Sequence, residues 1–421
     1  MEETPSAPSV FTPLEPLWEQ QASAPYPPGA FLDLSSTEWL NQSLPSEVLQ
    51  HLGDGHAIQY VVNAYFTTIH TWLPIVSKKR MNMGVSLSQG GPDLAMLFLA
   101  MELIATRPTD VLAGSQHMAI YHAAKRFMSL LEQSGATSVM VLQSMTLIAY
   151  FEYAHALYPA AWITVAACVR YADFLGLSGF HEGNVILASP TTWTELEERS
   201  RTWWAIISLD RIICLGNKKR YLSPEPQDNE TYPVDDEAWD EGRVGRAAHH
   251  NITSPPPSPP SPFSSLCRST LIAGKIITHV RKATSDRKQN PLALPADAIA
   301  EANALSETLF STLETERDGD DDMNMNGNGL HNRHEGQSGG SDIGSVSSLI
   351  LDALYGAANT LAWLLREEGT LECEDEMNVI KRCLERLSSR WRLAGEYGRM
   401  LEQQDFAMMM QDKGHSTLRI I

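Results

Sequence analysis

The stretch from Thr194 to Gly216 constrains the fold more than any other part of this chain. Its second half holds too many large apolar residues for one helical stripe: Trp203, Trp204, Ile206, Ile207, Leu209, Ile212 and Ile213. A helix that is apolar nearly all round is buried on most of its sides. The sequence therefore predicts a central helix that starts at a capping box of Thr194 and Glu197 and ends at Gly216 in a left-handed cap.

The charged residues of this predicted helix fall in two settings. At its start, two pairs lie four residues apart and predict a solvated face: Glu195 with Arg199, and Glu197 with Arg201. Asp210 and Arg211 lie instead in the apolar half, where an isolated charge is costly to bury. Adjacent residues point away from each other on a helix, so we expect each to pair with a different element and to pin helix packing. A ligand or catalytic role for these two residues is the alternative.

Helical spacing of apolar residues predicts an all-α fold, a large helical domain with a disordered N-terminal tail and inserted Pro-rich and acidic linkers. The expected helices cover 57–72, 93–105, 117–131, 139–153, 160–175 (capped by Gly176), 264–288, 293–316, 345–367 and 375–404. The expected regions are a disordered or weakly docked tail (1–50), a helical core (51–245), a Pro-rich linker (246–263), helices (264–317), a disordered acidic and Gly/Asn-rich segment (318–344) and C-terminal helices that pack on the core (345–421). Ser254, Ser258 and Ser261 each precede a proline and are candidate phosphorylation sites.

Five groups of residues between positions 56 and 245 follow one another in a recognisable order. They are Tyr65-Phe66 with Ile69-His70 and Trp72-Leu73-Pro74-Ile75-Val76; Tyr158-Pro159-Ala160-Ala161; Arg170-Tyr171 with Leu175-Gly176-Leu177; Arg201-Thr202-Trp203-Trp204 with Leu209-Asp210-Arg211 and Leu215-Gly216; and Tyr232-Pro233-Val234-Asp235-Asp236-Glu237-Ala238-Trp239. In this order they resemble the fungal-specific transcription factor domain, the all-helical middle region of fungal zinc-cluster regulators. One departure is Ser200, where relatives usually run several arginines together.

This resemblance implies a transcription regulatory protein that acts in the nucleus, with no enzymatic activity and no cofactor. The Pro233–Trp239 segment is similar to one found in a narrower subgroup, whose members often look like regulators of secondary-metabolite gene clusters. The structural signature of the family would then be Arg201, Trp203, Trp204, Asp210, Arg211 and Gly216. The basic run Lys218-Lys219-Arg220 is a candidate nuclear import signal.

The cysteines depart from the family pattern. A zinc cluster needs six closely spaced cysteines, whereas this chain has five, with no two in a CxxC arrangement: Cys168, Cys214, Cys267, Cys373 and Cys383. The net charge of −19 also opposes binding to phosphate. We therefore expect no direct DNA binding from this chain, and partners among the transcriptional machinery or DNA-binding proteins. Either the protein lacks the zinc cluster, or an upstream exon is missing from the gene model.

Two rival functions remain at this point. The helical core could be a protein-interaction or metabolite-sensing module with a small-molecule effector. The run Asp235–Asp240 could instead bind magnesium and a diphosphate, as aspartate-rich segments of all-α enzymes do, but no second metal-binding motif accompanies it and Pro233 favours a solvated loop. We expect no catalytic or metal-binding residues. We also expect no association with a membrane, since the longest uncharged apolar run, Tyr153–Val169, is too short to span one.

Overall fold

The computed structural model describes residues 44–82, 87–107, 111–178, 187–215, 220–243, 250–254, 261–289, 345–367 and 371–404, with Ala300, Asn303 and Ala304. Its named helices are α3 (Ser46–Leu52), α4 (Gly55–Thr68), α5 (Lys78–Asn82), α6 (Leu87–Ala105), α7 (Val111–Gln133), α8 (Val139–Ala154), α9 (Tyr158–Leu175), α10 (Trp193–Ile212), α11 (Asp236–Asp240), α12 (Pro262–Gln289), α14 (Ile350–Glu367) and α15 (Leu371–Ser388). The described residues form no strand beyond an isolated antiparallel bridge between Thr231 and Asn251. The predicted all-α fold is confirmed.

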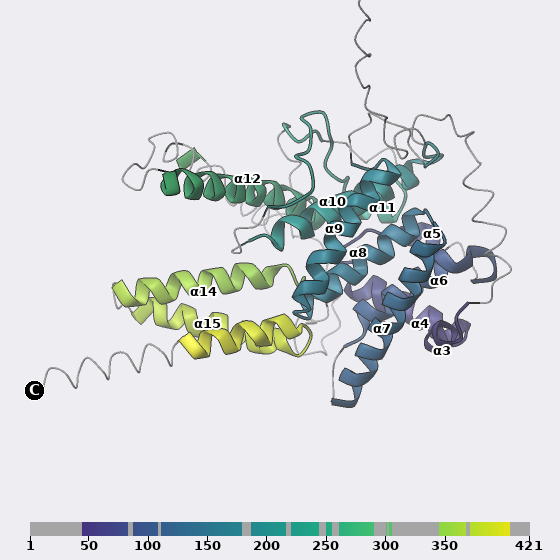
Figure 1. The fold of residues 1–421 in the computed structure, drawn as a ribbon, viewed down its shortest axis with the longest axis horizontal. Helices are drawn as coiled ribbons and strands as arrows, with labels where there is room; N and C mark the ends of the chain where they lie inside the picture. The colour runs from purple at the N-terminus through teal and green to yellow at the C-terminus, as the bar shows by residue number, and fades with distance from the viewer. Residues whose placement is uncertain are drawn as a thin grey trace, which may run out of the picture.

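Helix α8 is the centre of the molecule, as the apolar run at 139–153 predicts. Every residue from Val141 to Ala154 is buried, and α8 packs between α6 and α9 (Figure 1). The polar side chains on it each have at least one partner, either in α8 itself or in a neighbouring element. Glu152, fully buried, accepts a hydrogen bond from the Tyr121 hydroxyl at 2.7 Å and pairs with Lys125 at 3.1 Å. A helix buried on all sides must pair its charges within the protein, because each unpaired charge would cost several kcal/mol, of the order of 3–5.

Local chemistry explains where several helices begin and end. The Asp54 carboxylate caps α4 by accepting the backbone N–H groups of His56 and Ala57 at 3.0 and 2.9 Å. Within α6, Gly91 has a φ of 64° and interrupts the helix, so that Pro92 starts its apolar part. Gly176, at φ 81°, ends α9 in the predicted left-handed cap.

Several region boundaries differ from the expected ones. Helix α3 lies where the sequence suggests the end of a disordered tail, and its Val48 is buried, while residues 1–43 lie outside the described part. Helix α12 begins at Pro262, inside the expected linker. The helix expected at 375–404 is divided, since α15 ends at Ser388 and a further helical segment follows at 392–404. The helix expected at 293–316 and the segment 318–344 lie largely or wholly outside the described residues.

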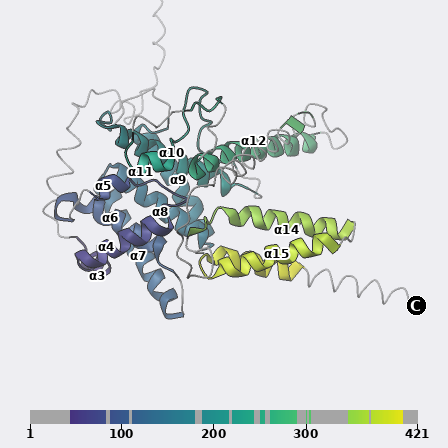
Figure 2. The same ribbon diagram turned by 180° about the vertical axis from the view of Figure 1, so that it is seen from behind.

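The C-terminal helices α14 and α15 form a hairpin that projects from the body formed by α3–α10, as Figures 1 and 2 show from opposite sides. The chain after α15 ties this hairpin to the body. Arg390 donates to the carbonyl oxygens of Ile104 and Thr106 at 2.6 and 2.7 Å, and the buried Trp391 ring meets Trp72 edge-on at 6.3 Å between centroids. None of the described helices combines the length and apolar character needed to cross a bilayer.

Two buried histidines lie side by side where α7 meets α8. The rings of His117 and His155 are 5.0 Å apart, and His117 Nε2 donates to the Leu103 carbonyl at 2.9 Å. Burial holds the pKa of His155 well below its ordinary value and also lowers the pKa of His117, with Arg390 adding to both shifts. Both side chains are therefore neutral in the folded protein at neutral pH, whereas they take up protons in the unfolded chain below a pH of about 6.5.

We expect His155→Phe to reduce the loss of stability on acidification. Because the depressed pKa favours the unfolded state once the pH falls below about 6.5, each such histidine contributes a slope of at most about 1.4 kcal/mol per pH unit. Burial raises the pKa of Glu102 to about 7, so this residue makes the folded state more stable as the pH falls. This opposite contribution is the same in the unchanged protein and in the His155→Phe variant. Urea unfolding between pH 7 and pH 5 measures the slope. His122→Phe, the same substitution at an exposed position of α7, is the control for the change of residue type.

Candidate functional site

Helix α10 starts with a capping box, but two residues earlier than predicted. Thr192 Oγ1 accepts the backbone N–H of Glu195 at 3.2 Å, and the Glu195 carboxylate accepts the N–H of the residue before the cap at 3.0 Å. The prediction that Thr194 and Glu197 form this box is wrong. The predicted pair of Glu195 with Arg199 is confirmed, with the nitrogen and oxygen 2.5 Å apart.

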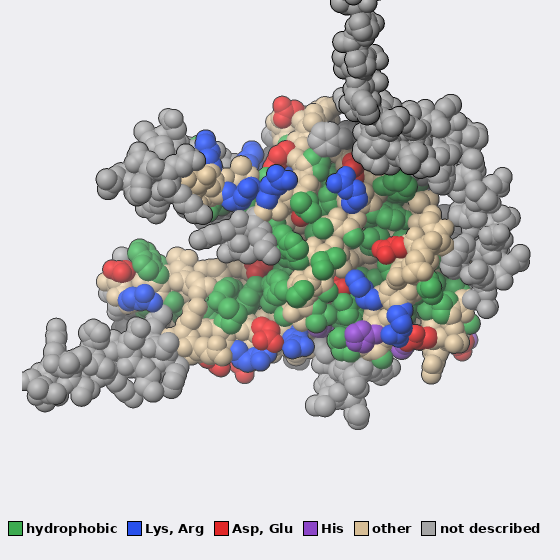
Figure 3. Space-filling model, in the orientation of Figure 1, with side chains coloured by type: hydrophobic (Ala, Val, Ile, Leu, Met, Phe, Trp, Pro, Cys, Tyr) green, Lys and Arg blue, Asp and Glu red, His purple; other side chains and the backbone are tan. Residues whose placement is uncertain are grey.

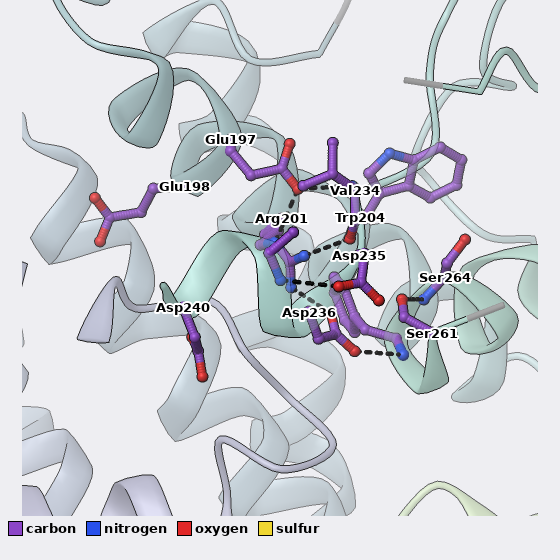
Figure 4. A network of polar contacts seen from close by, with 12 residues as sticks. Glu197, Glu198, Arg201, Trp204, Val234, Asp235, Asp236, Asp240, Ser261 and Ser264 are labelled. Atoms are coloured by element: carbon purple, nitrogen blue, oxygen red, sulfur yellow. Dashed lines mark hydrogen bonds and ion pairs between the residues drawn. The ribbon is translucent and has the colours of Figure 1, made fainter. Parts of the chain in front are cut away.

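Glu197 and Arg201 form an ion pair that is buried, and the prediction of a solvated pair is wrong. Arg201 is 0% exposed, and its Nε donates to Glu197 Oε1 at 2.9 Å. Together they hold both backbone groups of Val234 (Figure 4): Glu197 accepts its N–H at 2.9 Å, and Arg201 Nη2 donates to its carbonyl at 2.6 Å. The pair is buried because the chain after α10 folds back over this side of the helix.

The same guanidinium reaches two further elements. Arg201 Nη1 donates to Asp236 Oδ1 at 2.6 Å, and the other oxygen of Asp236 accepts the backbone N–H of Phe263 at 3.2 Å. The Arg201 guanidinium also lies 4.3 Å from the centroid of the buried Trp239 ring. One cation thus joins α10, α11 and the start of α12. The expected solvated loop at Asp235–Asp240 is instead a short helix docked on this cation.

Aromatic residues complete this network. Trp239 also stacks on His70 at 5.9 Å between centroids, with an interplanar angle of 16°, and His70 Nε2 lies 3.0 Å from Asp240 Oδ1. Trp204 Nε1 donates to the Thr231 carbonyl at 3.1 Å. Trp204 therefore holds the segment after α10 just before Val234, and Trp239 holds it just after Val234.

A second carboxylate of α10 binds the opposite side of the core. Glu198 is buried, and its Oε1 accepts the backbone N–H of Ser77 at 3.0 Å and the Gln143 amide at 3.2 Å. Its other oxygen pairs with Arg80 of α5. Helix α10 is consequently bonded through consecutive glutamates to elements on two of its sides.

Asp210 and Arg211 are buried, as predicted, but both find partners in one segment rather than in two different elements. Asp210 Oδ2 accepts the backbone N–H groups of Leu222 and Ser223 at 2.8 and 2.6 Å. Arg211 Nη2 donates to Glu225 Oε2 at 2.9 Å. Burial raises the pKa of Asp210 above its ordinary value, although the two N–H donors act in the opposite direction.

Replacing Asp210 by Ala should lower the free energy of unfolding by about 1–3 kcal/mol, because it leaves two backbone N–H groups without an acceptor. The effect should be smaller than the 3–5 kcal/mol expected where a buried cation loses its partner. Denaturant melts provide the measurement, and Asp228→Ala, at an exposed position of the same segment, should stay within about 0.5 kcal/mol of the unchanged protein. Equal losses in both variants would contradict the assignment.

The remaining predicted residues are placed in part. Gly216, Lys218, Lys219 and Ser258 lie outside the described residues. Arg220 is exposed, and Ser254 is half-buried. Ser261 is 7% exposed and its Oγ accepts the Ser264 N–H at 3.4 Å, which places it at the start of α12. Nuclear import through the basic run and phosphorylation of the serines stay predictions.

The buried carboxylates of α10 are paired within the protein, although Arg211 Nε and Nη1 have no hydrogen-bond partner among the described residues. Glu197, Glu198 and Asp210 each accept at least two donors from the protein, so their oxygens are committed to holding other segments. Within the described residues, no group of three or more His, Cys, Asp or Glu side chains is placed to hold a metal ion. The chemistry of this site is therefore mechanical attachment of the segments 220–240 and 261–263 to a central helix.

The comparison with protein families agrees with this geometry. The model of the fungal specific transcription factor domain matches residues 62–318, which include every element of the α10 network. The chain belongs to this family. Three residues of the quoted motifs join α10 to the segment that follows it in this fungal transcription factor domain. They are Arg201, Trp204 and Asp210.

Relatives of this fungal transcription factor domain include known regulators. It is 34% identical over 167 residues to the transcription factor BOA15 of Botryotinia fuckeliana, covering 38% of this chain and 86% of that protein. It is 25% identical over 236 residues to the pigment biosynthesis transcriptional activator pigB of Monascus ruber, covering 53% and 42%. It is 23% identical over 177 residues to the asperfuranone cluster transcription factor afoA of Emericella nidulans, covering 37% and 26%. This chain thus spans less than half of the last two. No solved structure matches it.

Sequence reasoning missed several members of the network. Glu198 and Glu225 are not singled out by any spacing, because Glu198 binds residues far away in the sequence and Glu225 lies in the segment after α10. His70 and Asp240 each belong to a quoted motif, but their contacts with each other and of His70 with Trp239 were not foreseen. Asp236 stood inside a quoted motif, and the adjacent buried tryptophan could have signalled that this acidic segment docks on a cation.

Proposed function

We propose that this fungal transcription factor domain acts in the nucleus to control a secondary-metabolite biosynthesis gene cluster. The observation that carries the proposal is the family match over residues 62–318, together with relatives named for pigment biosynthesis and for the asperfuranone cluster. The family and these relatives are transcription factors rather than enzymes.

The geometry supports a role in protein contacts. The charged groups of α10 are used to hold segments of the domain together, so that their function is to fix its shape. A shape fixed by a central polar network suits a scaffold that presents its outer helices to other proteins. We infer that the partners belong to the transcriptional machinery or are DNA-binding proteins.

The distribution of cysteines and charge supports indirect contact with DNA. Cys168, Cys214 and Cys267 are buried, while Cys373 and Cys383 lie in α15. These five thiols do not assemble a zinc cluster in the described fold. The net charge of −19 repels phosphate. In this proposal, a partner protein supplies the base-specific contacts.

Deleting the gene and profiling transcripts tests the proposal. We expect a set of genes, including a biosynthetic cluster, to change expression, with loss or gain of its product in metabolite extracts. Complementation with the intact gene should restore the transcripts. An Arg201→Ala allele should fail to do so, because the domain loses its central attachment.

One outcome of the deletion experiment would contradict the proposed regulatory role. Unchanged cluster transcripts together with accumulation of one pathway intermediate would reject the regulatory role and favour an enzyme. A gel shift with the purified chain tests indirect DNA contact separately, and tight sequence-selective binding at near-physiological salt would contradict that part.

A further inference from the structure

The hairpin of α14 and α15 carries an open apolar groove far from the α10 network. The groove encloses about 530 Å³ and is lined by Ala357, Thr360 and Leu361 of α14 and by Glu376, Val379 and Ile380 of α15. Figure 3 shows hydrophobic side chains beside acidic and basic ones at the free end of this hairpin. Apart from Glu376 and Thr360, the lining is hydrophobic.

The apolar character continues along both helices beyond the groove. Ile350 lies seven residues before Ala357, so it shares the same face of α14, and it is 44% exposed. On α15, Val379 is 49% exposed, and Cys383, one turn later, is exposed as well. These exposed apolar side chains lie on the same side of the hairpin as the groove, and a partner that covers the groove would remove them from water.

The side of the hairpin that faces the body is already occupied. Leu351, Ala358 and Leu384 are fully buried between the helices and their neighbours. Asp352 of α14 accepts a hydrogen bond from Tyr153 of α8 at 2.6 Å and another from Tyr397. Packing against the body therefore uses the side of α14 that carries Asp352 and leaves the groove side open among the described residues.

The charges along α15 indicate what covers the groove. Its first half carries exposed acids at Glu374, Asp375 and Glu376, and its second half carries exposed bases at Arg382 and Arg386 with one exposed acid, Glu385, between them. Glu376 lies three residues before Val379 and Arg382 three residues after it. A second α15 that crosses antiparallel at Val379 places the acidic half of each helix along the basic half of the other, and brings each Glu376 to the level of the other copy's Arg382. A partner helix of uniform charge would meet like charge in one half.

We propose that the α14–α15 groove is the interface of an antiparallel homodimer of this chain. The interface is isologous, with its two-fold axis at Val379, so each apolar stripe covers the other and each of the two Glu376–Arg382 pairs forms between copies. This inference is independent of the regulatory role, since it rests only on the hairpin.

Analytical ultracentrifugation of the full chain over a range of concentrations tests the dimer. The unchanged protein should sediment as a dimer at micromolar concentration, and Val379→Glu should be monomeric because it buries two like charges at the axis. Val280→Glu on α12, where the valine is similarly exposed at 48%, is the matched control and should stay dimeric. A monomeric unchanged protein at all concentrations, or a dimeric Val379→Glu, overturns the proposal.

A charge-swap experiment separates interface effects from misfolding. Glu376→Arg alone and Arg382→Glu alone should each weaken self-association by about tenfold or more, because both intermolecular pairs become repulsive. An equimolar mixture of the two variants should form a heterodimer, since both pairs regain opposite charges. Failure of the mixture to associate, with helicity by circular dichroism unchanged, would show that another occupant, such as a small apolar ligand or another protein, fills the groove.

Discussion

Arg201→Ala is expected to lower the free energy of unfolding by about 3–5 kcal/mol, because it leaves the buried Glu197 carboxylate without its cation. The same change removes the donor that holds the Val234 carbonyl and the partners of Asp236 and Trp239. Denaturant-induced unfolding followed by circular dichroism measures the loss. Because several attachments fail together, unfolding of the α11 segment should also become less cooperative with the rest.

The control is an arginine of the same charge in an exposed pair. Arg170 is 85% exposed and pairs with Asp173 one turn away, so Arg170→Ala should change stability by no more than about 0.5 kcal/mol. Replacing Glu197 by Gln together with Arg201 by Met should recover part of the loss, because no isolated charge then remains buried. Similar effects of Arg201→Ala and Arg170→Ala would contradict the buried network.

Trp391→Ala should cost about 3–5 kcal/mol, the range for deleting a fully buried aromatic side chain. The indole fills the junction between the C-terminal helices and the body, where it contacts Trp72 and His155 and donates to the Val346 carbonyl at 3.1 Å. Its loss leaves a cavity at the base of the hairpin. Thermal and urea unfolding give the change, and limited proteolysis should show that the hairpin is released first.

Trp363 provides a matched control, since it is the same residue type on α14 but 55% exposed. Trp363→Ala should remain within about 0.5 kcal/mol of the unchanged protein. A loss as large as that of Trp391→Ala would mean that the hairpin, rather than its junction with the body, limits stability.

The fold could be read from the sequence where local chemistry decides it. The run at 139–153 is apolar on every face and coincides with α8, because only a central position can bury such a helix. Gly176 ends α9 as expected, since a residue with a left-handed backbone is needed there. The start of α10 was misplaced by two residues because several threonines and glutamates offer equivalent capping spacings, and packing selects among them.

The polar network could not be read in the same way. Glu197 and Arg201 have the spacing of a surface pair, and only the later segment that covers them turns them into a buried one. Asp210 was expected to pair with a different element from Arg211, but its Oδ2 accepts two backbone N–H groups of the same segment, and such groups are offered by every sequence. Spacing states which side chains share a face, whereas burial depends on which distant segment lies over that face.

The contact of Asp236 has a consequence for how this chain can vary in length. Its two oxygens bind Arg201 and the N–H of Phe263, so both ends of the intervening stretch are fixed to one point. Within this stretch, Asn251 forms an isolated bridge with Thr231, which precedes α11. The relative position of α11 and the start of α12 is therefore set by a single carboxylate, so a change in the number of residues between the two contacts is expected to leave this junction unchanged.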